Sequence, residues 1–137
     1  MKNAIIFHGS SSTPKSVWIP SIKKFLEGRG HKVCVPQLPR SFAPNLKVQL
    51  PFVLKRGSFN PETIIIAHSA GCPLALSVLE NINTRIKKVI LVAGYARPLR
   101  RVEDFHGKVL QKLADPILQN KYNWPKIKNN AEKIIFI

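Results

Sequence analysis

The stretch from Thr63 to Gly71 constrains the fold of this chain more than any other segment. Residues 63–67 are Thr-Ile-Ile-Ile-Ala, a short β-branched apolar run that predicts a buried strand. The tetrapeptide His68-Ser69-Ala70-Gly71 follows without a spacer. Beyond it, apolar residues recur at three- and four-residue spacing, as on the buried face of a helix. The sequence therefore predicts a strand, a sharp turn and a helix in immediate succession.

Four further apolar runs have the length and composition of strands. They cover residues 4–7, 32–35, 88–93 and 133–137. Helical patterns lie between them, at about residues 16–27, 46–55, 98–122 and 124–130. In these patterns Ser16 and Asn123 are predicted N-caps. Pro51 is predicted to limit or kink its helix, Gly107 to split one, and Pro116 to end or bend one. Uniformly apolar strands alternating with helices predict a three-layer α/β/α, Rossmann-like fold with a mainly parallel five-stranded sheet.

Three loops follow predicted strands directly, at residues 8–12, 68–71 and 94–97. The carboxyl ends of parallel strands meet at one edge of the sheet, where ligands bind in folds of this class. We therefore expect these three loops to cluster around a site.

Ser69 has the setting of a nucleophile elbow, in which a serine sits on a strained strand-to-helix turn. The usual G-x-S-x-G pattern is met by Gly71 but has Ala67 at its first position. The Ala70 N–H, at the start of the helix, is the predicted first oxyanion donor. The second is predicted from the Ser10 (or Ser11) N–H, with Gly9 allowing close approach. The structural alternative is that Ser69 only caps the helix.

The histidines offer no obvious base from their positions alone. His8 is either a pocket wall or a buried structural residue, and His68 orients the turn or lines the pocket. His31 is expected at the surface and His106 in the helical insert. Trp18 and Trp124 are expected to be packing residues. No group of His, Cys, Asp and Glu has metal-ligand spacing, so no metal and no cofactor are predicted.

Composition narrows the class of protein further. The length of 137 residues predicts one domain, and Cys34 and Cys72 are expected to be buried thiols in a cytoplasmic protein. No apolar run is long enough for a membrane span. The net charge of +15 is distributed as scattered pairs, not on one face, which argues against a nucleic-acid partner.

Several segments, in order, resemble the small α/β-hydrolases of the retinoblastoma-binding protein 9 / YdeN family. They are His8-Gly9, Trp18, Val33 to Pro36 with Leu38-Pro39, residues 63–71, Val89 to Tyr95, and Trp124 to Asn130 leading into residues 134–137. The resemblance covers nearly the whole chain. It implies a serine hydrolase that acts on small ester or acyl substrates, with Ser69 as nucleophile. It also implies that His8, Gly9, His68, Gly71 and Tyr95 form or support the pocket.

The resemblance further implies a Ser-Asp-His triad in that chain order. The aspartate of such proteins follows the strand that resembles Lys133 to Ile137, and the histidine comes later still. Asp104 and Asp115 precede that strand, and neither is assigned the role. We therefore expect a single α/β-hydrolase domain over residues 1–137 that lacks its C-terminal portion and is inactive as it stands.

Two other interpretations remain open from the sequence. The chain is a non-catalytic protein-interaction module on a hydrolase scaffold, or it assembles with another chain that supplies the Asp and His. Residues 97–122 are predicted to form a helical insert or lid over the site. The basic start of this insert, Arg97 to Arg101, is predicted to favour acidic substrates.

Overall fold

A single parallel sheet forms the centre of the molecule. The computed structural model describes residues 1–98 and 105–137. Its strands are β1 (Asn3–Phe7), β2 (Lys32–Cys34), β3 (Ile64–His68), β4 (Ile86–Val92) and β5 (Ala131–Phe136). They lie in the order β2-β1-β3-β4-β5, and every pairing is parallel. The predicted five-stranded parallel sheet is confirmed.

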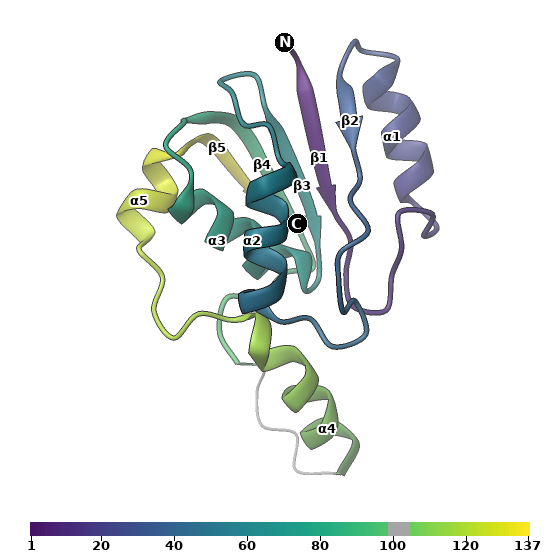
Figure 1. The fold of residues 1–137 in the computed structure, drawn as a ribbon, viewed down its shortest axis with the longest axis vertical. Coiled ribbons are helices and arrows are strands. Elements are labelled where there is room, and N and C mark those ends of the chain that lie inside the picture. Colours follow the sequence, from purple (N-terminus) through teal and green to yellow (C-terminus); the bar gives the residue numbers. More distant parts are fainter. Residues whose placement is uncertain (99–104) are drawn as a thin grey trace.

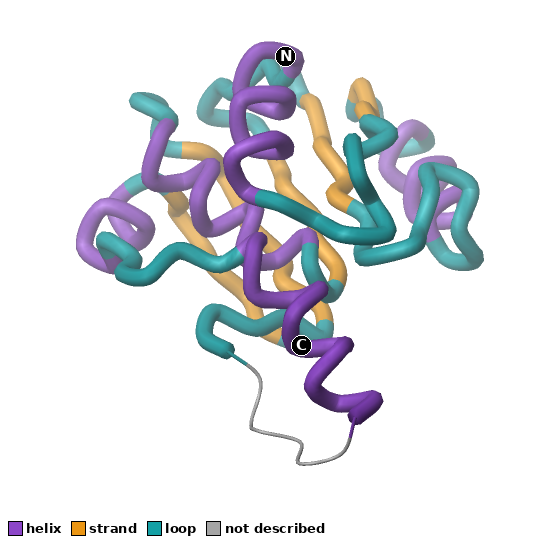
Figure 2. The backbone as a smooth tube through the Cα atoms, turned by 60° about the horizontal axis from the view of Figure 1, so that its bottom comes forward, coloured by secondary structure: helices purple, strands orange, loops and turns teal. Residues whose placement is uncertain are grey.

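Helices cover both faces of this sheet (Figure 1). They are α1 (Ile19–Glu27), α2 (Leu46–Arg56), α3 (Gly71–Asn81), α4 (Phe105–Ala114), the 3-10 turn η1 (Asp115–Ile117) and α5 (Trp124–Asn129). Helix α1 packs on one face, and α2, α3 and α5 pack on the other. Figure 2 shows the same layers from a tilted view. The α/β/α arrangement is thus confirmed.

The alternation of side chains along the strands divides the core in two. On β1, Ile5 and Phe7 point to the α2–α3–α5 side, whereas Ala4 and Ile6 point to the α1 side. All four side chains are at most 3% exposed. Both faces of β1 are therefore buried, which explains why its sequence is apolar throughout.

Two predicted helix breaks are absent, since Pro51 does not end α2 and Gly107 does not split α4, whereas a kink at Pro51 stays a prediction. Pro51 lies inside α2, which runs without a break to Arg56. Its ring is exposed, while Gln49 and Val53 on either side are buried, so packing outweighs the one backbone hydrogen bond that the proline cannot donate. Gly107 likewise lies within the continuous helix α4. Pro116 does mark the change from α4 to a 3-10 turn, as predicted.

The predicted caps had mixed outcomes. The Asn123 Oδ1 accepts the Lys126 N–H and caps α5, as expected. Ser16 does not cap α1, which starts at Ile19 after Trp18. Its hydroxyl instead accepts the Thr13 N–H, closing a turn ahead of the helix.

The prediction that both cysteines are buried is wrong for Cys34. Cys34 is exposed, whereas Cys72 is buried. The reason is strand order, because β2 lies at the edge of the sheet and has a neighbour on one side only. An apolar sequence such as that of residues 33–35 does not reveal whether its strand is central or at an edge.

The segment predicted as a lid contains α4 and η1. Figure 1 shows α4 projecting from the end of the molecule where the strands have their carboxyl ends. Its basic start lies only partly within the described residues: Arg97 is exposed, and Arg100 and Arg101 fall outside them. The assignment of this segment as a lid stays a prediction. No helix among the described residues is long and apolar enough to span a membrane.

Candidate active site

Ser69 sits on a strained turn between β3 and α3. Its φ of +50° is in the left-handed region, which costs a non-glycine residue about 1–2 kcal/mol. Backbone hydrogen bonds hold it there: the Ser69 N–H donates to the Val92 carbonyl, and the Cys72 N–H donates to the Ser69 carbonyl, both at 2.9 Å. The turn therefore has the backbone strain of an elbow. No side-chain cap is present on α3, so Ser69 does not act as its capping residue.

Two glycines allow the backbone segments around Ser69 to approach closely. A Cβ on Gly71 would lie 2.7 Å from the Phe7 carbonyl oxygen, closer than any real Cβ contact. A Cβ on Gly9 would lie 3.2 Å from the Ser69 Cβ and 3.1 Å from the His68 Nδ1. The loop after β1 thus touches the elbow, and α3 begins directly against the end of β1.

The predicted oxyanion donors lie on either side of this contact. Ala70 is buried next to Ser69, and Ser10 is exposed next to Gly9. Among the described residues, neither the Ala70 nor the Ser10 N–H donates a backbone hydrogen bond. The alternative donor, Ser11, is committed elsewhere, because its N–H donates to the Ser41 carbonyl at 2.8 Å. Of the two candidates after β1, Ser10 and Ser11, Ser10 is therefore the one whose N–H is not already donated to a backbone carbonyl among the described residues.

His8 has the burial and the contacts of a structural residue. It is 1% exposed, and both ring nitrogens face backbone groups. Nε2 accepts the Leu38 N–H at 3.0 Å, which assigns the proton to Nδ1, where it donates to the Gly9 carbonyl at 3.0 Å. Burial lowers the pKa of His8, partly opposed by the Gly9 hydrogen bond. A neutral imidazole thus fixes the loop that carries Gly9 and Ser10.

His68 belongs to the elbow itself, whereas His31 and His106 come from other parts of the chain. His68 packs its ring edge-on against Trp18, with 5.8 Å between ring centroids. His31 precedes β2, at the amino end of the sheet, and His106 is exposed on α4. Within the described residues, no histidine side chain is shown hydrogen-bonded to Ser69. The prediction that this chain lacks the base of the triad stays a prediction.

Cys72 secures the elbow in a way that the sequence did not reveal. Its Sγ lies 3.3 Å from the Ala67 carbonyl oxygen and 3.4 Å from that of Val92, and donates weakly to both. These contacts join the first turn of α3 to the ends of β3 and β4. Burial raises the pKa of Cys72 to about 12, so the thiol stays protonated and able to donate. A cysteine in an apolar pattern carries no sequence signal for such a role.

The third predicted loop, after β4, also reaches the elbow helix. A Cβ on Gly94 would lie 2.5 Å from the Cys72 Cβ. Tyr95 follows, half-buried, and its hydroxyl donates to the Ala114 carbonyl at 3.3 Å. Burial, with smaller contributions from Asp115, Tyr122 and Cys72, raises the pKa of Tyr95 to about 12.

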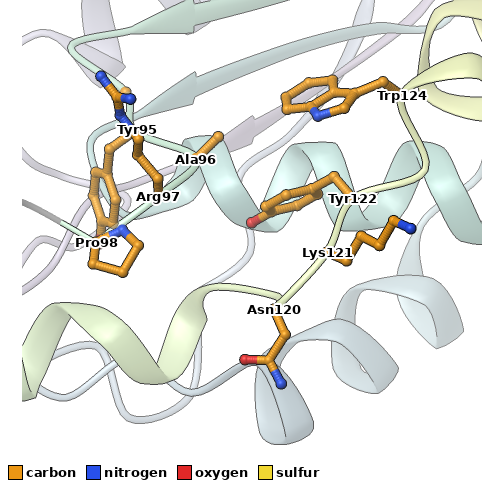
Figure 3. A pocket seen from close by; sticks show the side chains of 9 residues that line it. Tyr95, Ala96, Arg97, Pro98, Asn120, Lys121, Tyr122 and Trp124 are labelled. Carbon is orange, nitrogen blue, oxygen red and sulfur yellow. The ribbon is translucent and has the colours of Figure 1, made fainter.

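A cavity of about 1,100 Å³ opens beyond this loop (Figure 3). Residues 94–98 form one wall, and residues 120–122 with Trp124 form the other. Tyr95 lines it, but Ser69, His8 and His68 do not. The predicted site residues therefore divide into an elbow group and Tyr95, which lies in the adjoining cavity.

Among the described residues, no group of three or more His, Cys, Asp or Glu side chains is placed to hold a metal ion. The absence of a metal or cofactor stays a prediction.

Comparison with known proteins bears on the family and the fold of this chain. Residues 4–125 match the model of a family described as serine hydrolase. The chain is 28% identical over 134 residues to YdeN of Bacillus subtilis (strain 168), a protein named as a hydrolase. That alignment covers 96% of this chain and 66% of YdeN, so the chain spans just under two thirds of the length of this relative.

Solved structures give the same result. The crystal structure of the B. subtilis ydeN gene product matches with a TM-score of 0.83 and 29% identity, over 99% of this chain and 71% of that one. An extracellular α/β-hydrolase from a Paenibacillus species matches with a TM-score of 0.56 and 17% identity, over 71% of this chain and 42% of that one, which supports the fold alone. The family model covers most of the chain, and the resemblance found in the sequence is confirmed: the protein belongs to the serine hydrolase family and has the fold of its YdeN-type members.

Proposed function

We propose that this protein acts on small esters or related acyl compounds, with Ser69 as the nucleophile. The observation that carries the proposal is the strained backbone of Ser69, at a φ of +50°, between a buried strand and the start of α3. A fold tolerates such strain where the position that it gives the side chain is used. Membership of the serine hydrolase family supports the same role.

In the proposed reaction the ester first transfers its acyl group to Ser69. The Ser69 Oγ attacks the carbonyl carbon of the ester, and the developing oxyanion accepts hydrogen bonds from the Ala70 and Ser10 N–H groups. The carbon–oxygen bond to the alcohol then breaks, the alcohol leaves with a proton, and water later hydrolyses the acyl-serine to a carboxylic acid. The packing of Gly9 against Ser69 supports Ser10 as the second donor, since it brings the loop after β1 to the nucleophile.

Among the described residues, no side chain is evidently placed to accept the proton of the Ser69 hydroxyl. His8 is held by two backbone groups, and His68 packs on Trp18. Serine proteases that lack triad members keep an acceleration of about 10³–10⁴ over water from binding and the oxyanion hole. We therefore expect slow chemistry from the 137-residue chain, limited by loss of the Ser69 proton to solvent.

Fluorophosphonate labelling followed by peptide mass spectrometry tests the role of Ser69. We expect a single adduct on Ser69, which is absent from Ser69→Ala and unchanged in Ser12→Ala, a matched change in the neighbouring loop. The rate should rise about tenfold per pH unit between pH 6 and 9, because hydroxide must remove the proton. A histidine base would instead give a plateau above about pH 7.5.

The outcome distinguishes the two main interpretations. Labelling that persists in Ser69→Ala, or no labelling at any pH, would overturn the proposed nucleophile and favour the protein-interaction module. Labelling of Ser69 with a plateau would keep the nucleophile but show that a base is present.

A further inference from the structure

The end of the molecule that carries the elbow exposes large apolar side chains from three segments. These segments are the loop between β1 and α1, the loop between β2 and α2, and helix α4. Val17 in the first loop is 95% exposed, and Phe42 in the second is 68% exposed. On α4, Val109 and Leu113 are exposed as well. Apolar side chains gathered at one end of a molecule indicate contact with another apolar surface.

The two loops lie directly beside the elbow. Val17 precedes Trp18, whose ring packs on the histidine of the elbow. Phe42 follows Ser41, whose carbonyl accepts the N–H of Ser11 from the loop after β1. Figure 1 shows α4 projecting from the same end of the sheet. All three segments therefore lie at the end of the sheet that carries the elbow.

A tight turn fixes the position of Phe42. Arg40, two residues earlier, has a φ of +53°, and its carbonyl accepts the Ala43 N–H at 2.9 Å. A left-handed backbone at a non-glycine residue is strained and persists only where its surroundings hold it. The aromatic ring is thus presented to solvent by a hydrogen-bonded turn.

The exposed apolar side chains of both loops have cations close to them in sequence. Lys15 precedes Val17 by two residues, Arg40 precedes Phe42 by two residues, and both cations are exposed. Neither loop, residues 8–18 or 36–45, contains an aspartate or a glutamate. The loops therefore combine apolar contact area with charge of one sign only.

Helix α4 has the same combination. Val109 and Leu113 are four residues apart and form one stripe of the helix. The exposed Lys108 and Lys112 form a second stripe beside it. The helix contains no aspartate or glutamate, and residues 99–104, outside the described part, add two arginines and two carboxylates, which balance. Helices with adjoining apolar and basic stripes lie in the plane of a membrane interface.

This combination favours an anionic lipid surface over other partners. A second copy of the chain, bound through the same surface, would bring like charges together. The phosphates of a nucleic acid would pair with the cations but leave the apolar side chains in water. A bilayer with anionic headgroups accommodates both kinds of side chain. The formal net charge of +15 adds long-range attraction in the same direction.

We propose that the loops after β1 and β2, together with α4, dock this protein on an anionic lipid surface, with Val17 and Phe42 at the acyl-chain boundary. The elbow lies at the docked end, so the substrates of Ser69 would be esters of lipids in that surface. This second statement rests on the proposed function, whereas the docking does not.

Cosedimentation with vesicles tests the docking. The probes are vesicles of phosphatidylcholine alone and vesicles in which about one third of the lipid is phosphatidylglycerol. We expect the anionic vesicles to bind at least about ten-fold more tightly, since each lysine or arginine near such a surface contributes about five-fold. Raising the salt to about 0.5 M should reduce that preference, because it screens the charges.

Matched variants separate the apolar contribution from the charge. Phe42→Ser should weaken binding to anionic vesicles about ten-fold, because the ring no longer leaves water. Phe25→Ser should keep the affinity of the wild type, because Phe25 is 51% exposed in the last turn of α1, at the opposite end of the sheet. All the positions that these tests change are exposed, so circular dichroism should show the fold unchanged in each variant.

A double variant tests the basic stripe in the same way. Lys108→Gln with Lys112→Gln should weaken binding about 25-fold, at about five-fold for each charge. Lys24→Gln with Lys55→Gln removes the same charge from the last turns of α1 and α2, at the other end of the sheet, and should keep most of the affinity.

Ser69→Ala separates this inference from the proposed function. We expect it to bind anionic vesicles as the wild type does; intact binding without hydrolysis of lipid esters by the wild type would refute the substrate statement alone. Equal binding to both kinds of vesicle, or equal affinities of Phe42→Ser and Phe25→Ser, would overturn the docking. Self-association that Phe42→Ser abolishes, without vesicle binding, would assign the surface to a second copy instead.

Discussion

Replacing Gly71 by alanine tests whether close packing of α3 on β1 positions the elbow. The new Cβ would lie 2.7 Å from the Phe7 carbonyl oxygen, 3.0 Å from the Phe7 Cβ and 3.1 Å from the His8 carbonyl oxygen. Strand β1 is paired on both sides, to β2 and β3, so its backbone cannot yield easily. The start of α3 must therefore move outward by about 0.7 Å (3.4 − 2.7 Å) to restore an ordinary contact.

Overpacking of this kind costs about 1–3 kcal/mol, and a backbone obstacle places Gly71→Ala near the upper end. Alanine also lowers the conformational entropy of the unfolded chain, which stabilises the folded state by about 0.4–1 kcal/mol. The expected net loss is about 2 kcal/mol, or about 6–8 °C in Tm for a chain of this size.

Urea unfolding followed by circular dichroism measures the change, with Gly28→Ala as the matched control. At Gly28 the nearest atom to a new Cβ is the Lys24 carbonyl oxygen at 3.4 Å, and φ is −61°. That variant should be neutral or slightly stabilised. If Gly71→Ala unfolds within 0.5 kcal/mol of the wild type (about the limit of such measurements), the packing argument is refuted.

Three further predictions concern His8, the cysteines and Asn130. Because burial lowers the folded-state pKa of His8, its contribution to stability is fully present above the unfolded pKa of about 6.5 and is lost as pH falls below it. Urea midpoints between pH 7.5 and 5 should show this fall, and His8→Asn should flatten it. In the native state Ellman's reagent should modify Cys34 but not the buried Cys72, and both in denaturant; two fast thiols in the native state would contradict the burial of Cys72. Asn130→Ala should cost about 1–3 kcal/mol, since the buried Nδ2 donates to the carbonyls of Leu79 and Ile82; a loss under 0.5 kcal/mol by urea unfolding would contradict this.

The sequence predicted the order and type of the main elements because their patterns are local. The β-branched run Ile64-Ile65-Ile66 favours a buried strand, and its position before Ser69 follows directly. The predictions that were wrong concern features that depend on neighbours distant in the chain. Cys34 is exposed because β2 lies at the sheet edge, and α2 passes through Pro51 because its buried face packs on the core.

The candidate site was predictable to a similar degree. The strained turn at Ser69 and the approach of Gly9 follow from motif and topology, and the structure brings these residues together. The commitment of both His8 nitrogens to backbone groups depends on Leu38, thirty residues away, and no local pattern indicates it. The cavity between residues 94–98 and residues 120–122 with Trp124 likewise arises from segments distant in sequence.

The most direct test of the central claim is the chemical state of Ser69 after exposure to p-nitrophenyl acetate. Acylation expels p-nitrophenolate, a good leaving group, whereas deacylation must expel the serine oxygen. Without an evident base among the described residues, deacylation should therefore be the slower step, so an acyl-serine should accumulate. We predict an acetyl group on the peptide that contains Ser69, which hydroxylamine removes and which Ser69→Ala lacks. Acetylation confined to lysines, or equal in Ser69→Ala, would contradict the assignment of Ser69 as the nucleophile.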